Sequence, residues 1–185
     1  MDAIEEDVAY LNSEVLLIAS DPEHGERILR LLGTHPNVVG RIASAGSKAV
    51  GTAIRCGVPL VTFTKRLDAL LCAPSSDLPG SFATDLPGSL KELTRTALHV
   101  AHRSVFIDRT VAQLHFGFTP RVCEALMNLS VSRLLRLGDR HGLLLKLRTP
   151  DKVQIWERLL IGDRCAGPRG FRISQQTALL SLGNE

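Results

Sequence analysis

The sequence is poor in aromatic residues, paired cysteines and long hydrophobic runs, and each shortage excludes a class of protein. Aromatic residues make up 4% of the 185 residues, too few for an aromatic-lined pocket or a base-stacking surface. Cys56, Cys72, Cys123 and Cys165 form no CxxC pair, so neither a zinc finger nor a disulfide framework is indicated. The longest apolar runs fall far short of the ~18 residues of a membrane span, and the acidic start MDAIEEDV is unlike a secretory signal. We therefore expect a cytoplasmic protein with reduced thiols and no membrane contact.

Patterns that would support catalysis are also missing. No serine stands in a Gly-x-Ser-x-Gly elbow, and the stretch 46–51 is neither a P-loop nor a dinucleotide fingerprint. His99 and His102 have a spacing that could hold a metal, but no nearby Cys, Asp or Glu completes a site. We expect no catalytic residue, no cofactor and no metal, and therefore no enzyme. A hydrolase or thiol enzyme is an alternative only because Ser, Cys and His are present.

The charge of the chain is small but unevenly placed. The net charge is +3, yet residues 1–64 carry 5 Lys and Arg against 8 Asp and Glu. Residues 121–185 carry 11 Lys and Arg against 6 Asp and Glu, a net charge of +5. A basic C-terminal third suits an anionic partner, most often nucleic acid, although an ordinary solvated basic surface fits the charge equally well.

A weak internal repeat organises the chain. Gly33–Pro36 aligns with Gly117–Pro120, and after one extra residue in the second segment Leu60 aligns with Leu145. Both segments read as apolar helix, Gly, Pro, two short helices, Gly and a short strand-like piece. We interpret them as two copies of one module, since repeats of this kind build a fold from one supersecondary unit. Chance alignment of Gly and Pro between two helical segments is the alternative.

The repeat predicts a mainly α fold of two tandem small helical modules with helix-turn-helix-like pairs and short terminal strands. The N-terminal module covers residues 1–64, a Pro- and Gly-rich linker covers 65–89, and the C-terminal module covers 90–150. Residues 151–185 are expected to form a last helix and a loose tail. Within the second module we expect one unbroken helix, Leu90–Phe116, with an apolar stripe that continues through Ile107 and Leu114.

The most informative segment is Pro120–His141, which has the proportions of a helix-turn-helix. A first helix ends near Asn128, and Ser130 caps the next one. In the second helix Arg133, Arg136 and Arg140 are expected to share one outward face. The residues expected to point inward are Val131, Leu134, Leu135 and Leu137.

A basic helix face over a packed partner helix is what phosphate contact and groove entry require, so we predict that these three arginines bind DNA. An ordinary soluble face on an α-hairpin is the alternative. The positions that match Arg133 and Arg136 in the first module are Ala49 and Thr52, so the second module should make most of the contact.

The second module also resembles a known family. The motifs that carry the resemblance are Leu98-His99-Val100-Ala101-His102-Arg103, Asp108, Phe116-Gly117, Ala125-Leu126, Leu129, Leu134-Leu135 and Leu143 to Arg148. Over residues 93–149 this pattern resembles the FlhD family of flagellar transcriptional activators. The resemblance implies an all-helical fold, self-association, and activation of transcription in a complex on promoter DNA with an FlhC-like partner protein. That family has one module per chain and an inter-subunit cysteine where this chain has Leu145, so no covalent dimer is expected through that position.

The sequence thus favours a transcriptional regulator that binds promoter DNA together with an FlhC-like protein. The alternative is an adaptor or antagonist that does not bind DNA. It would use an apolar helix face of its own to occupy the partner-binding surface of another regulator.

Overall fold

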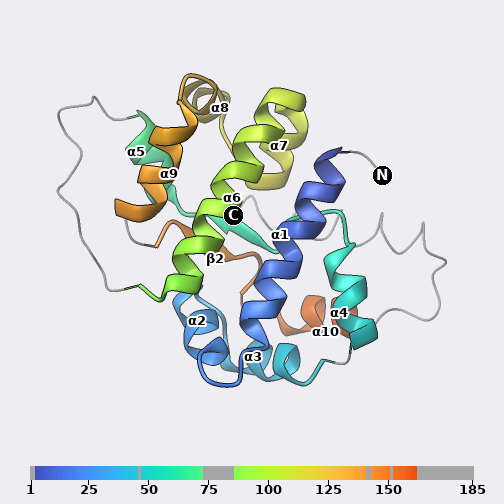
Figure 1. Cartoon of the computed structure of the whole chain (residues 1–185). Helices are drawn as coiled ribbons and strands as arrows, with labels where there is room; N and C mark the ends of the chain where they lie inside the picture. Colours follow the sequence, from blue (N-terminus) through green and yellow to red (C-terminus); the bar gives the residue numbers. More distant parts are fainter. Residues whose placement is uncertain (1–2, 46, 73–85, 141–142, 151, 162–185) are drawn as a thin grey trace. The chain divides into compact units, whose positions relative to one another are not determined.

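The computed structural model describes residues 3–45, 47–72, 86–140, 143–150 and 152–161. These residues form ten α-helices and one two-stranded antiparallel sheet, so the predicted mainly helical fold is confirmed (Figure 1). They divide into two compact units: the first contains residues 1–61 and 147–185, and the second contains residues 62–146. Across the described ranges, no helix combines the length and apolar character needed to cross a bilayer.

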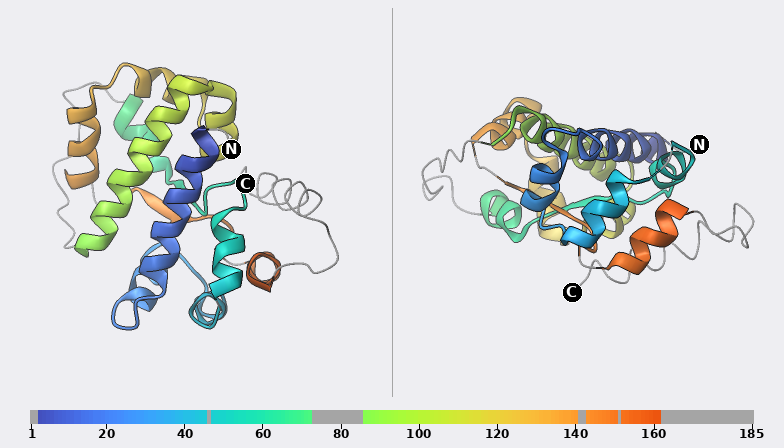
Figure 2. Two further views of the ribbon diagram at one scale, coloured as in Figure 1. Left: turned by 45° about the vertical axis from the view of Figure 1, so that its right-hand side comes forward. Right: turned by 90° about the horizontal axis from the view of Figure 1, so that it is seen from below.

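The first unit is built around one long helix. Its helices are α1 (Ala3–Ala19), α2 (Gly25–Leu31), α3 (Pro36–Ala43), α4 (Ser47–Ile54) and α10 (Val153–Ile161). Helix α1 packs on α2, α3 and α4, and α10 packs on α3 and α4, as Figure 2 shows. The buried side chains of α1 recur at helical spacing and include Ile4, Val8, Leu11, Val15 and Leu16. This apolar stripe explains why α1 forms and which face it buries.

A polar side chain lies inside that stripe. Asn12 is fully buried, and its Nδ2 donates hydrogen bonds to the carbonyl oxygens of Val58 at 3.0 Å and Ile54 at 3.3 Å. Its Oδ1 accepts a hydrogen bond from the backbone nitrogen of Leu60 at 2.8 Å. Beside it, the thiol of Cys56 donates to the carbonyl of Val58 at 3.1 Å, and burial raises the pKa of Cys56 to about 11. A buried amide needs hydrogen-bond partners, and the backbone partners of Asn12 lie within residues 54–60. Asn12 therefore holds this segment against α1.

The chain enters the first unit a second time at residue 147. Leu147 donates its backbone N–H to the carbonyl of Leu32 at 2.8 Å, and Arg148 donates its own to the carbonyl of Leu60 at 2.8 Å. The buried guanidinium of Arg148 also donates from Nε to the carbonyl of Pro59 at 3.1 Å, and burial lowers the pKa of Arg148 to about 10. The second entry is therefore part of the core of this unit.

The second unit is organised by its own long helix. Its helices are α5 (Lys65–Cys72), α6 (Gly88–Ile107), α7 (Arg109–Phe116), α8 (Pro120–Met127) and α9 (Val131–Arg140). Helix α6 packs on α7, α8 and α9, while α5 packs on α8. Three aromatic rings, Phe63, Phe116 and Phe118, pack together with centroids 5.4 to 5.8 Å apart. These three phenylalanines form the aromatic part of this core.

The predicted single helix Leu90–Phe116 is wrong, because the chain breaks at Asp108. This residue has an extended backbone with φ −153°, and its Oδ1 accepts hydrogen bonds from the backbone nitrogens of Thr110 at 2.8 Å and Val111 at 3.1 Å. Aspartate is a favoured N-cap, so it ends α6 and starts α7. The helical phase therefore changes after Asp108.

The predicted linker also differs from the structure. Residues 65–72 form α5, in which Leu67 and Leu70 are buried. Residues 73–85, most of the expected linker, lie outside the described residues, as does the expected tail from residue 162.

The described ranges contain two strands of three residues each. They are β1 (Val61–Phe63) and β2 (Leu145–Leu147), and they pair with each other. The backbone nitrogen of Thr64 donates to the carbonyl of Leu144 at 2.8 Å just beyond the paired residues. Each unit boundary falls within one of these strands.

Candidate nucleic-acid interface

The helix pair α8–α9 forms where the sequence predicts it. Thr119 caps α8 by accepting a hydrogen bond from the backbone nitrogen of Val122 at 3.3 Å, and Pro120 occupies the first turn. Helix α8 ends at Asn128, and α9 opens with Ser130, whose Oγ accepts a hydrogen bond from the backbone nitrogen of Arg133 at 3.4 Å. Both helices pack on α6, which gives the pair a fixed base.

Helix α9 lies close to α6 through a small residue. Leu134 is 0% exposed, and Gly138, one turn later, is also buried. A Cβ built on Gly138 would lie 3.3 Å from Cγ of Arg95 and 3.5 Å from Cδ1 of Leu98, both on α6. The close approach of the two helices therefore depends on the absence of a side chain at position 138.

This contact sets which face of α9 is outward, and it corrects part of the prediction. Val131 is 49% exposed and Leu135 is 39% exposed, so the prediction that both point inward is wrong. Leu134 is buried as predicted, and Leu137 is half-buried. The buried line runs through Leu134 and Gly138. Val131 and Leu135 each lie three positions before one of these residues, about 60° around the helix from it.

Two of the three predicted arginines lie on the exposed surface of α9. Arg133 and Arg136 are both exposed, and Nε of Arg136 donates to the carbonyl of Ser132 at 3.2 Å. Within the described ranges, neither guanidinium forms an ion pair with a carboxylate. Arg140 is the last residue of α9, and its side chain lies outside the described residues.

The acidic residue on α9 is engaged elsewhere. Asp139 pairs with Arg95 of α6, with 2.6 Å between Nη2 and Oδ1 and a hydrogen bond of 2.8 Å from Nε. Arg95 also pairs with Glu92, and its hydrogen bond to Asp139 raises the pKa of Arg95. This exposed pair links α9 to α6, and among the described residues no carboxylate pairs with Arg133 or Arg136.

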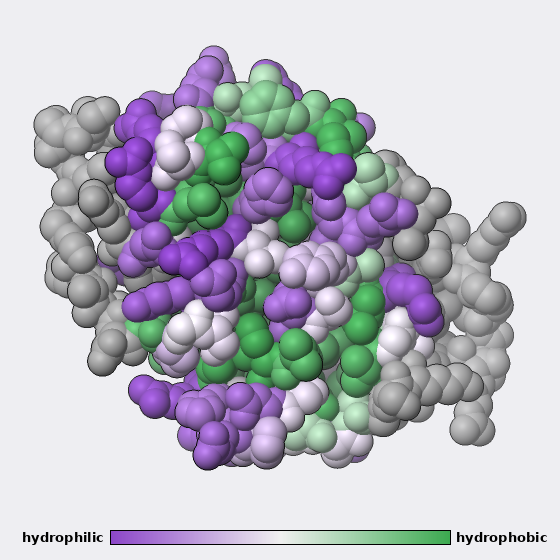
Figure 3. Space-filling view, viewed as in Figure 1, coloured by the Kyte–Doolittle hydropathy of each residue, from purple (hydrophilic) through white to green (hydrophobic). Residues whose placement is uncertain are grey.

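Exposed apolar side chains occur in the same unit. Phe106 is 56% exposed, Ile107 46% and Leu114 52%, in addition to the two apolar residues of α9. Figure 3 shows apolar surface among hydrophilic side chains at the top of the view, where α7 lies. Ile107 and Leu114 were expected in the apolar stripe of one long helix. The break at Asp108 changes the helical phase and leaves both residues outside the core. The preference of aspartate for N-cap positions is the sequence signal that could have predicted this break.

The two histidines lie in different surroundings. His99 is exposed, while a ring nitrogen of His102 lies 3.3 Å from the carbonyl of Leu129, and its ring meets Phe106 edge-on with centroids 4.9 Å apart. In the part of the chain that the structure describes, no three His, Cys, Asp or Glu side chains gather around a common point.

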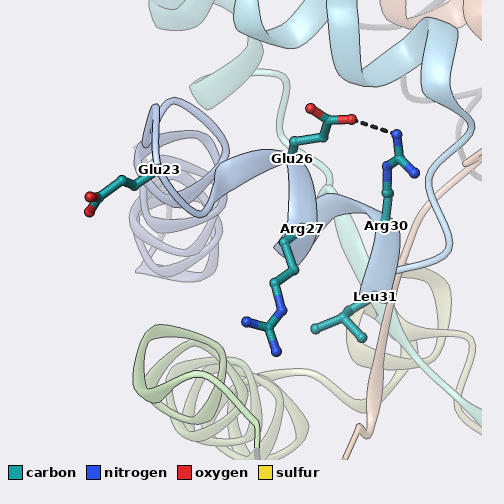
Figure 4. A pocket seen from close by; sticks show the side chains of 5 residues that line it. All are labelled: Glu23, Glu26, Arg27, Arg30 and Leu31. Atoms are coloured by element: carbon teal, nitrogen blue, oxygen red, sulfur yellow. Dashed lines mark hydrogen bonds and ion pairs between the residues drawn. The ribbon is translucent and has the colours of Figure 1, made fainter.

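An open pocket in the first unit offers a different surface. It is lined by Glu23, Glu26, Arg27, Arg30 and Leu31. Figure 4 shows Glu26 and Arg30 joined on one side, at 2.6 Å, while Arg27 and Leu31 point to the other. The lining contains no nucleophile or histidine, so it offers charge without the groups for acid–base or covalent chemistry.

The exposed arginines of α9 are therefore the arrangement that matches an anionic polymer best. Comparison with protein families, curated proteins and solved structures found no match for this chain.

Proposed function

We propose that this protein is a transcriptional regulator that contacts promoter DNA through α9. The observation that carries the proposal is the exposure of Arg133 and Arg136 on a helix whose acidic residue, Asp139, is paired with Arg95. Exposed guanidinium groups without a carboxylate partner among the described residues suit phosphates and base edges, which both accept hydrogen bonds from arginine.

The distribution of charge supports the choice of this unit. Residues 62–146 contain 11 Lys and Arg against 7 Asp and Glu, a net charge of +4. Residues 1–61 and 147–185 contain 11 against 12, a net charge of −1. The positive net charge of the second unit favours its association with a polyanion.

The resemblance to the FlhD family supplies the second part of the proposal. We propose that the chain activates transcription as a subunit of a complex with an FlhC-like protein. Its exposed apolar residues on α6, α7 and α9 would supply the protein contact. Two cationic contacts alone give weak, sequence-independent binding, so a partner that adds base contacts would explain how a promoter is selected.

Selection from a random pool of DNA duplexes tests the function. The full chain, alone and with a co-expressed FlhC-like protein, is incubated with the pool, and bound duplexes are amplified and sequenced. We expect enrichment of a shared motif with the partner present, and affinity that falls as salt rises. No enrichment and no salt-dependent retention in either arm would contradict the proposal.

A second function is favoured by a specific observation, the five exposed apolar side chains of the second unit. In this alternative the protein is an adaptor or antagonist that binds another regulator through its own apolar helix face and does not bind DNA. Phe106→Ser with Leu114→Ser should then abolish binding to an FlhC-like protein, while Arg133→Ala with Arg136→Ala leaves it unchanged. Loss of DNA binding from the arginine variant would instead favour the first function.

A further inference from the structure

The two halves of the chain show the same order of structural elements. Each half runs helix, helix, helix, helix, strand, helix: α1 to α4, β1 and α5 in the first, and α6 to α9, β2 and α10 in the second. The third helix has eight residues in both halves, and both strands have three. An order of six elements that recurs, with equal lengths at the third helix and the strand, extends the correspondence beyond the Gly and Pro positions of the sequence.

The connections between the elements also correspond. Gly33 has φ 82° and Gly117 has φ 69°, both in the left-handed region that favours glycine. Two residues later each half has an N-cap whose side chain accepts a backbone hydrogen bond, His35 from Asn37 and Thr119 from Val122. Each cap precedes a proline in the first turn of its helix.

The last helix of each half belongs to the unit built on the other half. Helix α10 follows β2 but packs on α3 and α4, where Trp156 and Leu159 are fully buried and Glu157 pairs with Arg41 at 2.8 Å. Helix α5 follows β1 but packs on α8, with Leu67 fully buried. The exchange is therefore reciprocal.

The points at which the chain changes units correspond as well. The first change lies between Val61 and Thr62, and the second between Lys146 and Leu147. These two positions are separated by the same offset that aligns Leu60 with Leu145. Both halves therefore change units at equivalent residues.

One pair of hydrogen bonds repeats across the exchange. Leu147 donates its backbone N–H to the carbonyl of Leu32 at 2.8 Å, within the first unit. The equivalent residue, Thr62, donates from Oγ1 to the carbonyl of Phe116 at 3.0 Å, within the second unit. Leu32 and Phe116 each precede the left-handed glycine of their half. The entering strand is thus anchored at the same place in both units.

We propose that the chain is a covalently joined pair of protomers that have exchanged their last helices. The surface of α3 and α4 is a docking surface for the last helix of the partner protomer, and the surface of α8 is its counterpart. The partner of each half is the other half of this chain. Exchange of an identical element between protomers is a low-cost route to dimers, and fusion of two such protomers makes it intramolecular.

Hydrogen exchange on the full chain tests whether the last helix of each half stabilises the helices of the other half. Trp156→Ala should raise amide exchange in residues 36–54 by roughly tenfold or more, and leave residues 120–140 close to wild type. Leu67→Ala should give the mirrored result, with faster exchange in residues 120–127 and little change in residues 36–54. Faster exchange of α8 and α9 in the Trp156 variant, without change in α3 and α4, would overturn the proposal.

A milder variant and a cleavage experiment apply if Trp156→Ala does not fold. Glu157→Gln removes the ion pair with Arg41 but no packing, and it should still raise exchange in α3 rather than in α8. In addition, a protease site introduced within residues 73–85 allows the folded chain to be cut between the halves. The fragments should co-elute as one species and separate only in denaturant. Fragments that elute separately, each with native exchange protection, would show that the halves are independent and would refute the exchange.

Discussion

The side chain of Asn12 and the backbone of Leu60 are joined by a hydrogen bond of 2.8 Å, from the Leu60 nitrogen to Oδ1 of Asn12. The two residues lie 48 positions apart, and both are buried. The same amide donates to the carbonyl of Val58, so one side chain holds the approach to β1 against the middle of α1. The contact therefore ties the segment that leads into β1 to α1.

Asn12→Ala should therefore destabilise the protein strongly. The substitution leaves the backbone groups of Leu60, Val58 and Ile54 without their partner in a buried site, which costs about 2–4 kcal/mol. Urea unfolding followed by the fluorescence of Trp156 measures the change. Ser13→Ala, next to it on α1, is the matched control and should change the free energy of unfolding by less than about 0.5 kcal/mol. A loss below about 1 kcal/mol for Asn12→Ala would show that the amide does not hold β1.

Cys56 should make stability depend on pH in the alkaline range. Burial raises the pKa of this thiol from 9.0 to about 11, so the folded state keeps the proton that the unfolded chain releases. The stabilisation is fully present below about pH 9 and is lost as pH rises through about 11, on the order of 2 kcal/mol in total.

Cys56→Ala removes the titration of the thiol together with its charge interaction with Arg148. Arg148 itself has a lowered pKa of about 10, which acts with the opposite sign above that pH, and it is present in both proteins. The difference in unfolding free energy between wild type and variant should therefore shrink between pH 8.5 and pH 11. A difference that is constant over this range would contradict the assignment.

Two glycines of the first unit should respond in opposite directions to alanine. Gly33 has φ 82°, and a Cβ there would meet nothing within 4 Å, so Gly33→Ala costs backbone strain alone, about 1 kcal/mol. Gly40 lies within α3, also with open space around it, so Gly40→Ala should stabilise by about 0.5–1 kcal/mol through helix propensity. Thermal unfolding of both variants provides the comparison. Equal effects would show that the turn at Gly33 relaxes.

Much of the helical framework could be predicted from the sequence. The spacing of apolar residues in α1, the Thr119-Pro120 start of α8 and the strand-like pieces before residues 64 and 148 all correspond to elements of the structure. The prediction of one helix over Leu90–Phe116 failed because Asp108 can either cap a helix or continue one. The periodicity of apolar residues does not distinguish these two possibilities.

The arrangement of the last helices could not be predicted. Residues 65–72 have an apolar stripe too short to distinguish a helix from a linker, and nothing local shows that α10 packs on α3 and α4. Such pairings are set by tertiary contacts between residues far apart in the sequence, such as Glu157 with Arg41.

The candidate site was predicted in its charge but not in its packing. Arg133 and Arg136 are exposed as expected, because arginine is rarely buried without a partner. The orientation of α9 depends on Gly138, which permits a close contact with Arg95 and Leu98. A hydrophobic pattern counts glycine as neutral, so it placed Val131 and Leu135 in the core instead.

The salt dependence of DNA binding tests the role of α9 most directly. The probe is a fluorescent duplex of about 30 base pairs, titrated with the full chain at several salt concentrations. Arg133→Ala with Arg136→Ala is compared with Arg27→Ala with Arg30→Ala, which removes the same charge from exposed positions of α2. If both arginines of α9 contact phosphates, the slope of log K against log salt becomes shallower by about 1.8 in the first variant and is unchanged in the second. Equal slopes for the wild type and the α9 variant would contradict the account.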